Sequence, residues 1–506
     1  MTPEDAAHTP APADIVIRGG RVVDPRSAQD GIADVAVRDG RIIAVGQVSA
    51  TARSTIDARG LVVAPGFIDL HSHAQTPIGL GFQALDGVTT ALDLESGTLP
   101  VQAQYAAAVT EGRPINFGFA ASWAVARMHV MAGIPLPTPA EDGTLTTAME
   151  VFQRNQRLPA WHRIATRAEV DSIIGVLADA VSQGAIGIGV LLGYAPASGR
   201  EEYFRVAELA ESAGVAVFTH SRQMSNQEPG SSVDGALEVI AAAAGSGARM
   251  HMCHINSTSL RRIDDVARAV TKAQSRGNQI TTEAYPYTMS STGIGAAFLA
   301  PDRLDRLGIE ASAITYLPTG TRVRDVDELA HLRATDPGGL CLIDYLDGDD
   351  PVDVRTLLRS FDVPGTVVAS DAMPIVGPDG RYLSGRSPLP EGSRVHPRSV
   401  GTFARTFGWL VRDLGALSLP DAVLRTSTIP AEILAPFVPR MRTKGRVAPG
   451  FDADITVFDP HRINDRASAI RIEASVGVRH VIVGGEPVVI EGALRTGTAG
   501  RPLKSR

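Results

Sequence analysis

The stretch Val62-Val63-Ala64-Pro65-Gly66-Phe67-Ile68-Asp69-Leu70-His71-Ser72-His73 is an apolar segment that ends in two histidines separated by one residue. Side chains alternate along a β-strand, so His71 and His73 are expected to point to the same side and to hold one ion between them. Neutral imidazole is the commonest nitrogen ligand of zinc and related metals. The alternative is a pair of unrelated strand histidines, so the rest of the chain has to supply matching ligands.

Eight apolar, strand-like segments alternate with segments of helical periodicity, which predicts a (β/α)₈ barrel of the TIM type over residues 61–440. The segments are Val62–His73, Val88–Glu95, Ile115–Ser122, Ala185–Leu192, Val215–His220, Arg249–His254, Ile280–Tyr287 and Thr366–Asp371. Residues 167–183 and 260–276 carry apolar side chains at helical spacing, as expected for helices that cover a barrel. Residues 124–165 are interpreted as an insertion and residues 374–395 as a loop that shapes the site.

Both ends of the chain consist of short strand-like segments separated by glycine-rich turns. Because domains often bring their termini together, residues 14–60 and 441–506 are predicted to form one small β-sandwich domain beside the barrel. Residues 1–13 are rich in proline and alanine and are expected to be a flexible N-terminus.

The composition favours a globular chain that acts on small soluble substrates. The chain has 506 residues, of which 44% are hydrophobic, and a net charge of -7, with no basic stripe. This argues against nucleic acid and anionic membranes as partners. With no signal-like or membrane-spanning apolar segment, we expect a cytoplasmic protein. Two cysteines, Cys253 and Cys341, are too few for a disulfide framework and are interpreted as buried apolar side chains.

Polar, metal-binding side chains occur at the C-terminal ends of five predicted strands, where barrels of this type place their active sites. Any one of them could be an ordinary buried polar residue, but agreement between five strand ends is hard to obtain by chance. The sequence therefore predicts a metal centre, with the expected ligands His71, His73, Glu95, His220 and His254, and with Asp371 beside them.

Several motifs resemble those of the amidohydrolase superfamily, and more closely its N-acyl-D-amino-acid deacylases, the D-aminoacylases. The resemblance covers most of the chain. It rests on residues 65–73, Gly87-Val88-Thr89-Thr90, Thr219-His220-Ser221-Arg222, Glu283-Ala284-Tyr285-Pro286-Tyr287, Ser370-Asp371 and His396-Pro397-Arg398. The resemblance implies hydrolysis of the amide bond of N-acyl amino acids, of D configuration, with one or two Zn²⁺ ions as cofactor.

The few lysines limit which ligand can bridge two ions. Many members of the superfamily use a carboxylated lysine on a barrel strand, but no lysine here lies on a predicted strand; the only lysines are Lys272, Lys444 and Lys504. Glu95 is the best-placed native carboxylate. The resemblance puts a cysteine at the end of strand two, where a gapless alignment gives Ser96. Glu95 therefore needs a local bulge to face the site, and Asp93 remains an alternative.

The expected mechanism follows from these ligands. A metal held by Glu95, His220 and His254 with an open position would turn water into a hydroxide nucleophile. Asp371 would act as general base and then as general acid toward the departing nitrogen. The histidine pair of the opening stretch would hold a second ion or orient the substrate. His251, three residues before His254, is interpreted as a packed residue.

Substrate recognition is expected to involve a free carboxylate beside the scissile amide. The resemblance implies that Arg398 binds this carboxylate through two parallel hydrogen bonds, with a surface ion pair as the alternative. Tyr285 and Ser291 match further substrate-contacting positions of the similar enzymes. Arg222 is also expected to bind substrate. Asn256 stands where similar enzymes carry a lysine, which puts the usual substrates in doubt.

Two other functions remain open at this point. The same centre could hydrolyse another carboxylate-bearing amide, such as a dipeptide, a cyclic amide or a specialised metabolite. The barrel could also be a metal-free scaffold, although that would predict eroded ligands. A small-molecule substrate is the expected partner, and a homo-oligomer is left open.

Overall fold

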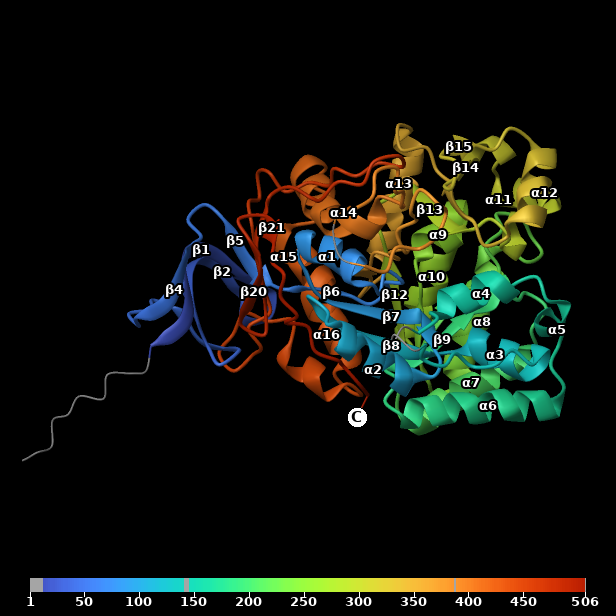
Figure 1. The fold of residues 1–506 in the computed structure, drawn as a ribbon, viewed down its shortest axis with the longest axis horizontal. Coiled ribbons are helices and arrows are strands. Elements are labelled where there is room, and N and C mark those ends of the chain that lie inside the picture. The colour runs from blue at the N-terminus through green and yellow to red at the C-terminus, as the bar shows by residue number, and fades with distance from the viewer. Residues whose placement is uncertain (1–11, 141–144, 386–387, 506) are drawn as a thin grey trace, which may run out of the picture.

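The computed structural model describes residues 12–140, 145–385 and 388–505, and its centre is a sheet of eight parallel strands (Figure 1). In chain order these are β6 (Phe67–Asp69), β7 (Val88–Thr98), β8 (Asn116–Ser122), β9 (Gly187–Leu191), β10 (Ala216–His220), β11 (Arg249–Met252), β12 (Ile280–Ala284) and β17 (Val367–Val368). Each of the eight predicted segments contributes one strand, so the predicted barrel is confirmed.

The barrel closes between its first and last strands at the residues that follow them. The amide of His73 donates to the carbonyl of Ala372 at 2.8 Å, and the amide of Ala372 donates to the carbonyl of His71 at 3.3 Å. Below them, the buried carboxylate of Asp69 accepts a hydrogen bond from the amide of Ser370 at 2.9 Å. Closure therefore brings the histidine pair next to Asp371.

The first predicted strand is wrong in its extent, because residues 62–73 belong to two sheets. β5 (Val62–Pro65) pairs with β18 (Ile455–Phe458) in the β domain, whereas β6 starts the barrel. The break is at Gly66, where a Cβ atom would lie 2.3 Å from the side chain of Thr89. His71 and His73 follow β6 instead of forming part of it.

Helices cover the outside of the barrel. In α10, the buried residues Ile263, Val266, Val270 and Ala273 recur at helical spacing and face the sheet. The helices are α1 (Pro77–Leu85), α2 (Val101–Glu111), α3 (Trp123–Ala132), α4 (Ala148–Asn155), α5 (Pro159–His162), α6 (Arg167–Ser182), α7 (Arg200–Ala213), α8 (Ser232–Ser246), α9 (Ile255–Ser259), α10 (Ile263–Gln274), α11 (Leu304–Leu307), α12 (Val326–Thr335), α13 (Pro351–Arg359), α14 (Arg398–Arg405), α15 (Leu419–Val423) and α16 (Ile429–Leu434). None of the helices in the described ranges is long and apolar enough to cross a membrane.

Strands from both ends of the chain share one nine-stranded sheet, seen as the blue and dark red strands of Figure 1. It contains β1 (Ala13–Asp24), β2 (Gln29–Arg38), β3 (Arg41–Gly46), β4 (Ala52–Asp57), β5, β18, β19 (Val478–Val483), β20 (Glu486–Ile490) and β21 (Ala493–Leu494). The predicted β domain made from both ends is thus present. The last residues return to the barrel, where the amide of buried Leu503 donates to the carbonyl of Phe117 at 2.8 Å.

A four-stranded antiparallel sheet lies between β12 and β17, and the sequence analysis did not predict it. Its strands are β13 (Met289–Gly293), β14 (Ile314–Tyr316), β15 (Thr321–Arg322) and β16 (Leu340–Asp344). They are short and separated by glycines, prolines and helical segments that include α12, so no periodicity marks them. The predicted insertion holds α4 and α5, while residues 1–11, 141–144 and 386–387 of the predicted N-terminus, insertion and loop lie outside the described residues.

Candidate metal centre

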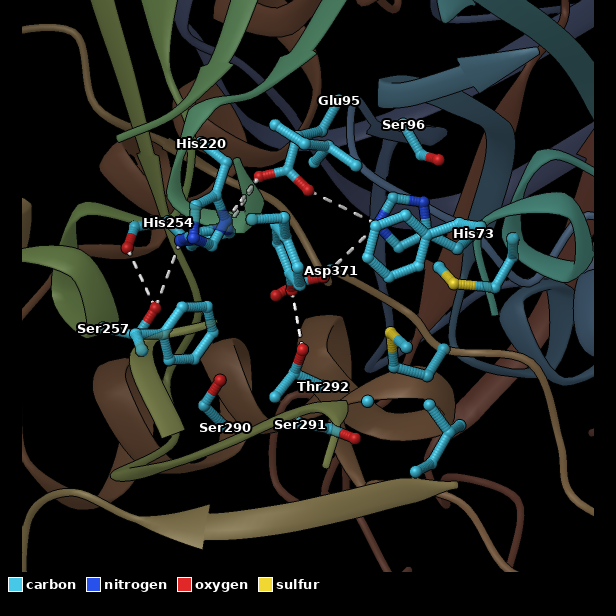
Figure 2. Close-up of a pocket in the computed structure, with 18 of the residues that line it drawn as sticks. His73, Glu95, Ser96, His220, His254, Ser257, Ser290, Ser291, Thr292 and Asp371 are labelled. Atoms are coloured by element: carbon cyan, nitrogen blue, oxygen red, sulfur yellow. Dashed lines mark hydrogen bonds and ion pairs between the residues drawn. The ribbon is translucent and has the colours of Figure 1, made fainter. Parts of the chain in front are cut away.

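The expected ligands meet at the C-terminal mouth of the barrel, around the carboxylate of Glu95 (Figure 2). Glu95 Oε1 lies 2.8 Å from His254 Nε2 and 3.2 Å from His220 Nδ1. Glu95 Oε2 lies 3.2 Å from His71 Nε2 and 3.6 Å from His73 Nε2. All five side chains are buried. One carboxylate therefore faces a pair of imidazoles on each side, which is the arrangement of a ligand that bridges two ions.

A bulge in β7 brings Glu95 into this position. The pairing of β7 with β8 shifts register between Asp93 and Thr98, and Gly97 has a positive φ of 62°. The amide of Gly97 donates to the carboxylate of Asp93 at 3.1 Å. The extra residues break the strand alternation, as the sequence analysis required for Glu95 to face the site. Ser96 also lines the pocket, whereas Asp93 contacts His73 from outside the centre.

Glu283 was missed as a functional residue, although it is the last but one residue of β12, the seventh barrel strand. Its buried carboxylate contacts His71 Nδ1, lies 3.0 Å from His251 Nε2 and accepts a hydrogen bond from the amide of His254 at 3.2 Å. Burial raises the pKa of Glu283, but His71 and His251 lower it by more than burial raises it. The pKa of Glu283 therefore lies well below its usual value. A carboxylate on the far ring nitrogen turns His71 Nε2 toward the centre.

Two other histidines are oriented in the same way. His73 Nδ1 lies 3.0 Å from Asp93 Oδ1, and His254 Nδ1 lies 3.2 Å from the hydroxyl of Ser257, so each Nε2 faces Glu95. His220 is turned the other way and presents Nδ1 to Glu95. These contacts fix which nitrogen of each ring is available to an ion.

The carboxylates make the cluster a site for positive charge. Burial lowers the pKa of His71, but three neighbouring carboxylates, led by Glu283, raise it well above its usual value. Burial also lowers the pKa of His73, and Asp93 more than offsets this, giving a pKa of about 9. Surroundings that hold protons on buried imidazoles also favour a divalent cation in place of those protons.

Asp371 lies at the mouth side of the centre, opposite Glu95. Its Oδ1 is 3.3 Å from His71 Nε2 and 3.7 Å from His73 Nε2. Its backbone has a positive φ of 49°, which only a few per cent of non-glycine residues adopt. This conformation occurs three residues after the end of β17 and aims the carboxylate at the histidine pair.

Arg398 lies behind the pocket and is not among the residues that line it. Its guanidinium is fully buried, lies 2.6 Å from Asp371 Oδ2, and donates to the carbonyl of Asp371 at 2.7 Å. It also stacks on Tyr285 and approaches Ser290 Oγ at 3.3 Å. The alternative that Arg398 forms a surface ion pair is excluded, because its ion pair with Asp371 is buried.

The other expected substrate residues divide between the pocket and its surroundings. Ser291 lines the pocket, and its hydroxyl has no hydrogen-bond partner among the residues that the structure describes. The side chain of Asn256 accepts a hydrogen bond from the amide of Tyr285 at 3.4 Å, below the pocket surface. Arg222 lies outside the pocket. Its guanidinium donates hydrogen bonds to the carboxylate of Glu238 and to a backbone carbonyl.

An aromatic wall, formed by Phe152, Tyr194 and Phe298, lines the pocket beside His220. The ring of Tyr194 lies 5.3 Å from Phe152, 5.5 Å from Phe298 and 4.9 Å from His220. Met149, Met224, Leu191, Leu340 and Met373 extend the apolar surface. The sequence analysis missed this wall, because its members come from three distant segments and carry no shared motif.

A parallel barrel whose C-terminal mouth gathers four histidines and two carboxylates is typical of metal-dependent hydrolases. The model of the amidohydrolase family matches residues 54–338, more than half of the chain, and the chain belongs to this family. Among curated relatives, the chain is 28% identical over 500 residues to an N-acyl-D-glutamate deacylase of Alcaligenes xylosoxydans xylosoxydans, covering 93% of both chains. A D-aminoacylase of the same organism is 28% identical over 97% of this chain and 98% of its own.

Solved structures give the same result. A crystal structure of N-acyl-D-glutamate deacylase from Bordetella bronchiseptica, complexed with zinc and a phosphonate inhibitor, has a TM-score of 0.76 at 25% identity. It covers 97% of this chain and 100% of that one. A crystal structure of D-aminoacylase has a TM-score of 0.75 at 24% identity, over the same shares, and supports the fold. The resemblance to the amidohydrolases and their D-aminoacylases is therefore confirmed.

Proposed function

We propose that this protein is a metal-dependent hydrolase that cleaves the amide bond of N-acyl-D-amino acids, giving a carboxylate and a free amino acid. The observation that carries the proposal is the carboxylate of Glu95 between two histidine pairs, with Asp371 Oδ1 only 3.3 Å from His71 Nε2. Relatives named as D-amino-acid deacylases over nearly the whole chain support the D configuration.

The donor atoms fit zinc. Imidazole nitrogens and carboxylate oxygens are its ordinary ligands alongside thiolates, and their mutual distances suit one ion on each side of Glu95. Glu95, His220 and His254 would hold one ion, and His71, His73 and Asp371 would surround a second position. Bound zinc would polarise the amide carbonyl and promote deprotonation of water.

Asp371 has the position required of a proton carrier. Arg398 holds Oδ2, which leaves Oδ1 facing the centre. Asp371 accepts a proton from the attacking water as the new carbon–oxygen bond forms. It then donates that proton to the amide nitrogen as the carbon–nitrogen bond breaks, because an unprotonated amide anion is a very poor leaving group.

Unpartnered hydroxyls offer a place for the free carboxylate of the substrate. Within the described part of the chain, Ser291 Oγ and the hydroxyl of Tyr345 are buried without a hydrogen-bond partner, and both residues line the pocket. The guanidinium of Arg398 lies directly behind, next to Ser290. We infer that these hydroxyls bind the carboxylate while Arg398 supplies positive charge from below.

The aromatic wall favours substrates with an apolar arm. No arginine or lysine among the described residues lines this pocket, so an acidic substrate side chain would be buried without a partner. Leucine-, methionine- or phenylalanine-like groups would instead bury apolar surface against Phe152 and Phe298.

A hydrolysis screen tests the proposal. Zinc-loaded protein is given N-acetyl and N-formyl derivatives of D- and L-leucine, methionine, phenylalanine and glutamate, and free amine is measured. We expect turnover of the D-isomers with apolar side chains. Turnover of cyclic amides or dipeptides, with none for any N-acyl amino acid, would contradict this proposal and favour the other carboxylate-bearing amides considered above.

A further inference from the structure

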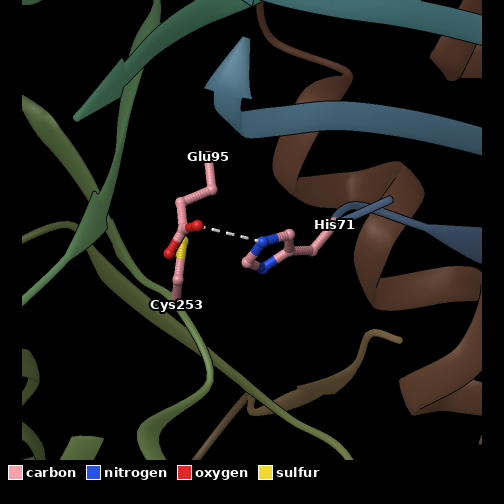
Figure 3. Close-up of side chains that lie close together, drawn as sticks. All are labelled: His71, Glu95 and Cys253. Atoms are coloured by element: carbon pink, nitrogen blue, oxygen red, sulfur yellow. Dashed lines mark ion pairs between the residues drawn. The ribbon is translucent and has the colours of Figure 1, made fainter. Parts of the chain in front are cut away.

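Cys253 lies close to Glu95 and His71 in the candidate metal centre (Figure 3). Its sulfur, a ring nitrogen of His71 and a carboxylate oxygen of Glu95 all lie within 4.8 Å of one another. The three side chains are buried, with at most 4% of any of them exposed. Three donor atoms of the types that zinc binds therefore converge from three different barrel strands.

The backbone explains how two consecutive residues both face the centre. Cys253 and His254 follow β11, and in a regular strand their side chains would point to opposite sides. His254 instead has a positive φ of 31°, which breaks the alternation at this position. The amide of Cys253 is fixed by a hydrogen bond to the carbonyl of Thr219 at 3.0 Å.

The polar surroundings of Cys253 distinguish it from the other cysteine. Its sulfur also lies within 4.8 Å of donor atoms of His251 and Glu283, so charged or ionisable groups face it from two directions. Cys341 is buried in β16 within a hydrophobic cluster, and its thiol donates a hydrogen bond to the carbonyl of Thr292 at 3.4 Å. Packing as a small apolar side chain accounts for Cys341, but it leaves the convergence around Cys253 unexplained.

We propose that Cys253 is a thiolate ligand of the metal ion on the His71 side of the centre, shared with His71 and Glu95. The inference rests on the proposed metal centre and adds a ligand to it. On metal binding the thiol loses its proton to solvent, as coordinated thiols do. A soft sulfur ligand also makes this position select zinc or cobalt over magnesium, calcium and manganese.

Two spectroscopic measurements test the inference on the intact protein. X-ray absorption at the zinc edge of the zinc-loaded protein should require a sulfur neighbour at about 2.3 Å. The cobalt-loaded protein should show a thiolate-to-cobalt charge-transfer band in the near ultraviolet. Because a thioether gives no such thiolate band, the second measurement distinguishes Cys253 from the nearby thioether of Met224, which lies 3.3 Å from His220 Nε2.

Variants assign the sulfur. Cys253→Ser should lose the charge-transfer band while Cys341→Ser, the matched control, retains it. Stoichiometric zinc with only nitrogen and oxygen neighbours in the wild type would overturn the role of Cys253 and leave the proposed centre standing. Failure to retain any metal would overturn both. If Cys253→Ser does not fold, the wild-type spectra and the Cys341→Ser control still decide.

Discussion

The two carboxylate oxygens of Asp371 contact different partners. This arrangement supports the proposed role of Asp371 as proton carrier. Oδ2 pairs with buried Arg398 at 2.6 Å, while Oδ1 faces the imidazoles of His71 and His73. A carboxylate held on one side by a guanidinium keeps its orientation when the proton moves at the other oxygen. Proton transfer and metal retention should therefore be separable by substitution.

Asp371→Asn keeps the shape and the contact to Arg398 but removes the base. We expect zinc content near that of the wild type and kcat/KM lower by about 10²- to 10⁴-fold, the usual contribution of a positioned general acid–base. Elemental analysis and hydrolysis of the best substrate check both parts. Activity above a tenth of the wild type would reject Asp371 as the proton carrier.

Glu283→Gln tests the residue that orients His71. The amide keeps the volume but loses the charge that contacts His71 and His251. Loss of such a supporting carboxylate typically weakens metal affinity by about 10- to 100-fold. Competition with a chelator measures this, with Glu432→Gln, in the exposed ion pair with Arg26, as control. Equal affinities of the two variants would contradict the orienting role.

At the scale of elements, the bulge in β7 is possible because β9, the strand on the other side of β8, carries a glycine where the end of β7 approaches it. A Cβ atom on Gly189 would lie 2.2 Å from the carbonyl oxygen of Glu95 and 2.6 Å from that of Leu94. The close approach of two backbones thus sets where the Glu95 carboxylate sits. The packing of β9 against β7 therefore supports the proposed metal centre, although Gly189 itself offers no atom that could bind a metal.

Gly189→Ala should displace the end of β7. We expect the free energy of unfolding to fall by about 1–3 kcal/mol, the usual cost of overpacking, together with weaker zinc binding. Gly175→Ala in α6 is the control, because a Cβ there meets nothing within 4 Å. That change should stabilise by about 0.5–1 kcal/mol. Denaturant unfolding and zinc titration measure the two effects. Equal free energies of unfolding and equal zinc affinities for the two variants would contradict the role of Gly189.

At the scale of the whole molecule, a buried ion-pair network in the β domain is linked to the barrel through Asn116. Lys444 Nζ contacts the carboxylates of Asp452, at 2.9 Å, and Asp454, which precede β18. Asp454 in turn accepts a hydrogen bond from Asn116 of β8 at 3.1 Å. Breaking this network would leave buried carboxylates without a counter-charge, which couples the stability of the two parts.

Lys444→Met should lower the free energy of unfolding by about 3–5 kcal/mol at pH 7. Burial lowers the pKa of Lys444, but Asp454 and Asp452 more than offset this and raise it above 10.5. The stabilisation is therefore complete below pH 10.5 and is lost as the pH rises through the folded-state pKa. Unfolding measured across this range, with exposed Lys272→Met as control, would contradict the network if the two variants were equally stable.

The sequence predicted what local pattern and strand ends encode. Each barrel strand was found from its apolar run, and Glu95 was expected to need the bulge that β7 has. The pairing of Arg398 with Asp371 and the placement of Arg222 outside the pocket depend on segments distant in the chain, so no local pattern marks them. Cys253 was interpreted as a packed apolar side chain because its sequence neighbours are apolar. The left-handed backbone of His254, which lets Cys253 and His254 face the same centre, could not be read from that pattern.

Anomalous diffraction at the zinc edge, from crystals of the zinc-loaded protein, tests the central claim most directly. We predict a peak within bonding distance of Glu95, His220 and His254, with any second peak on the His71 side of the same carboxylate. Absence of any peak at Glu95 in a protein that is otherwise folded as described would contradict the metal centre and the hydrolase built on it.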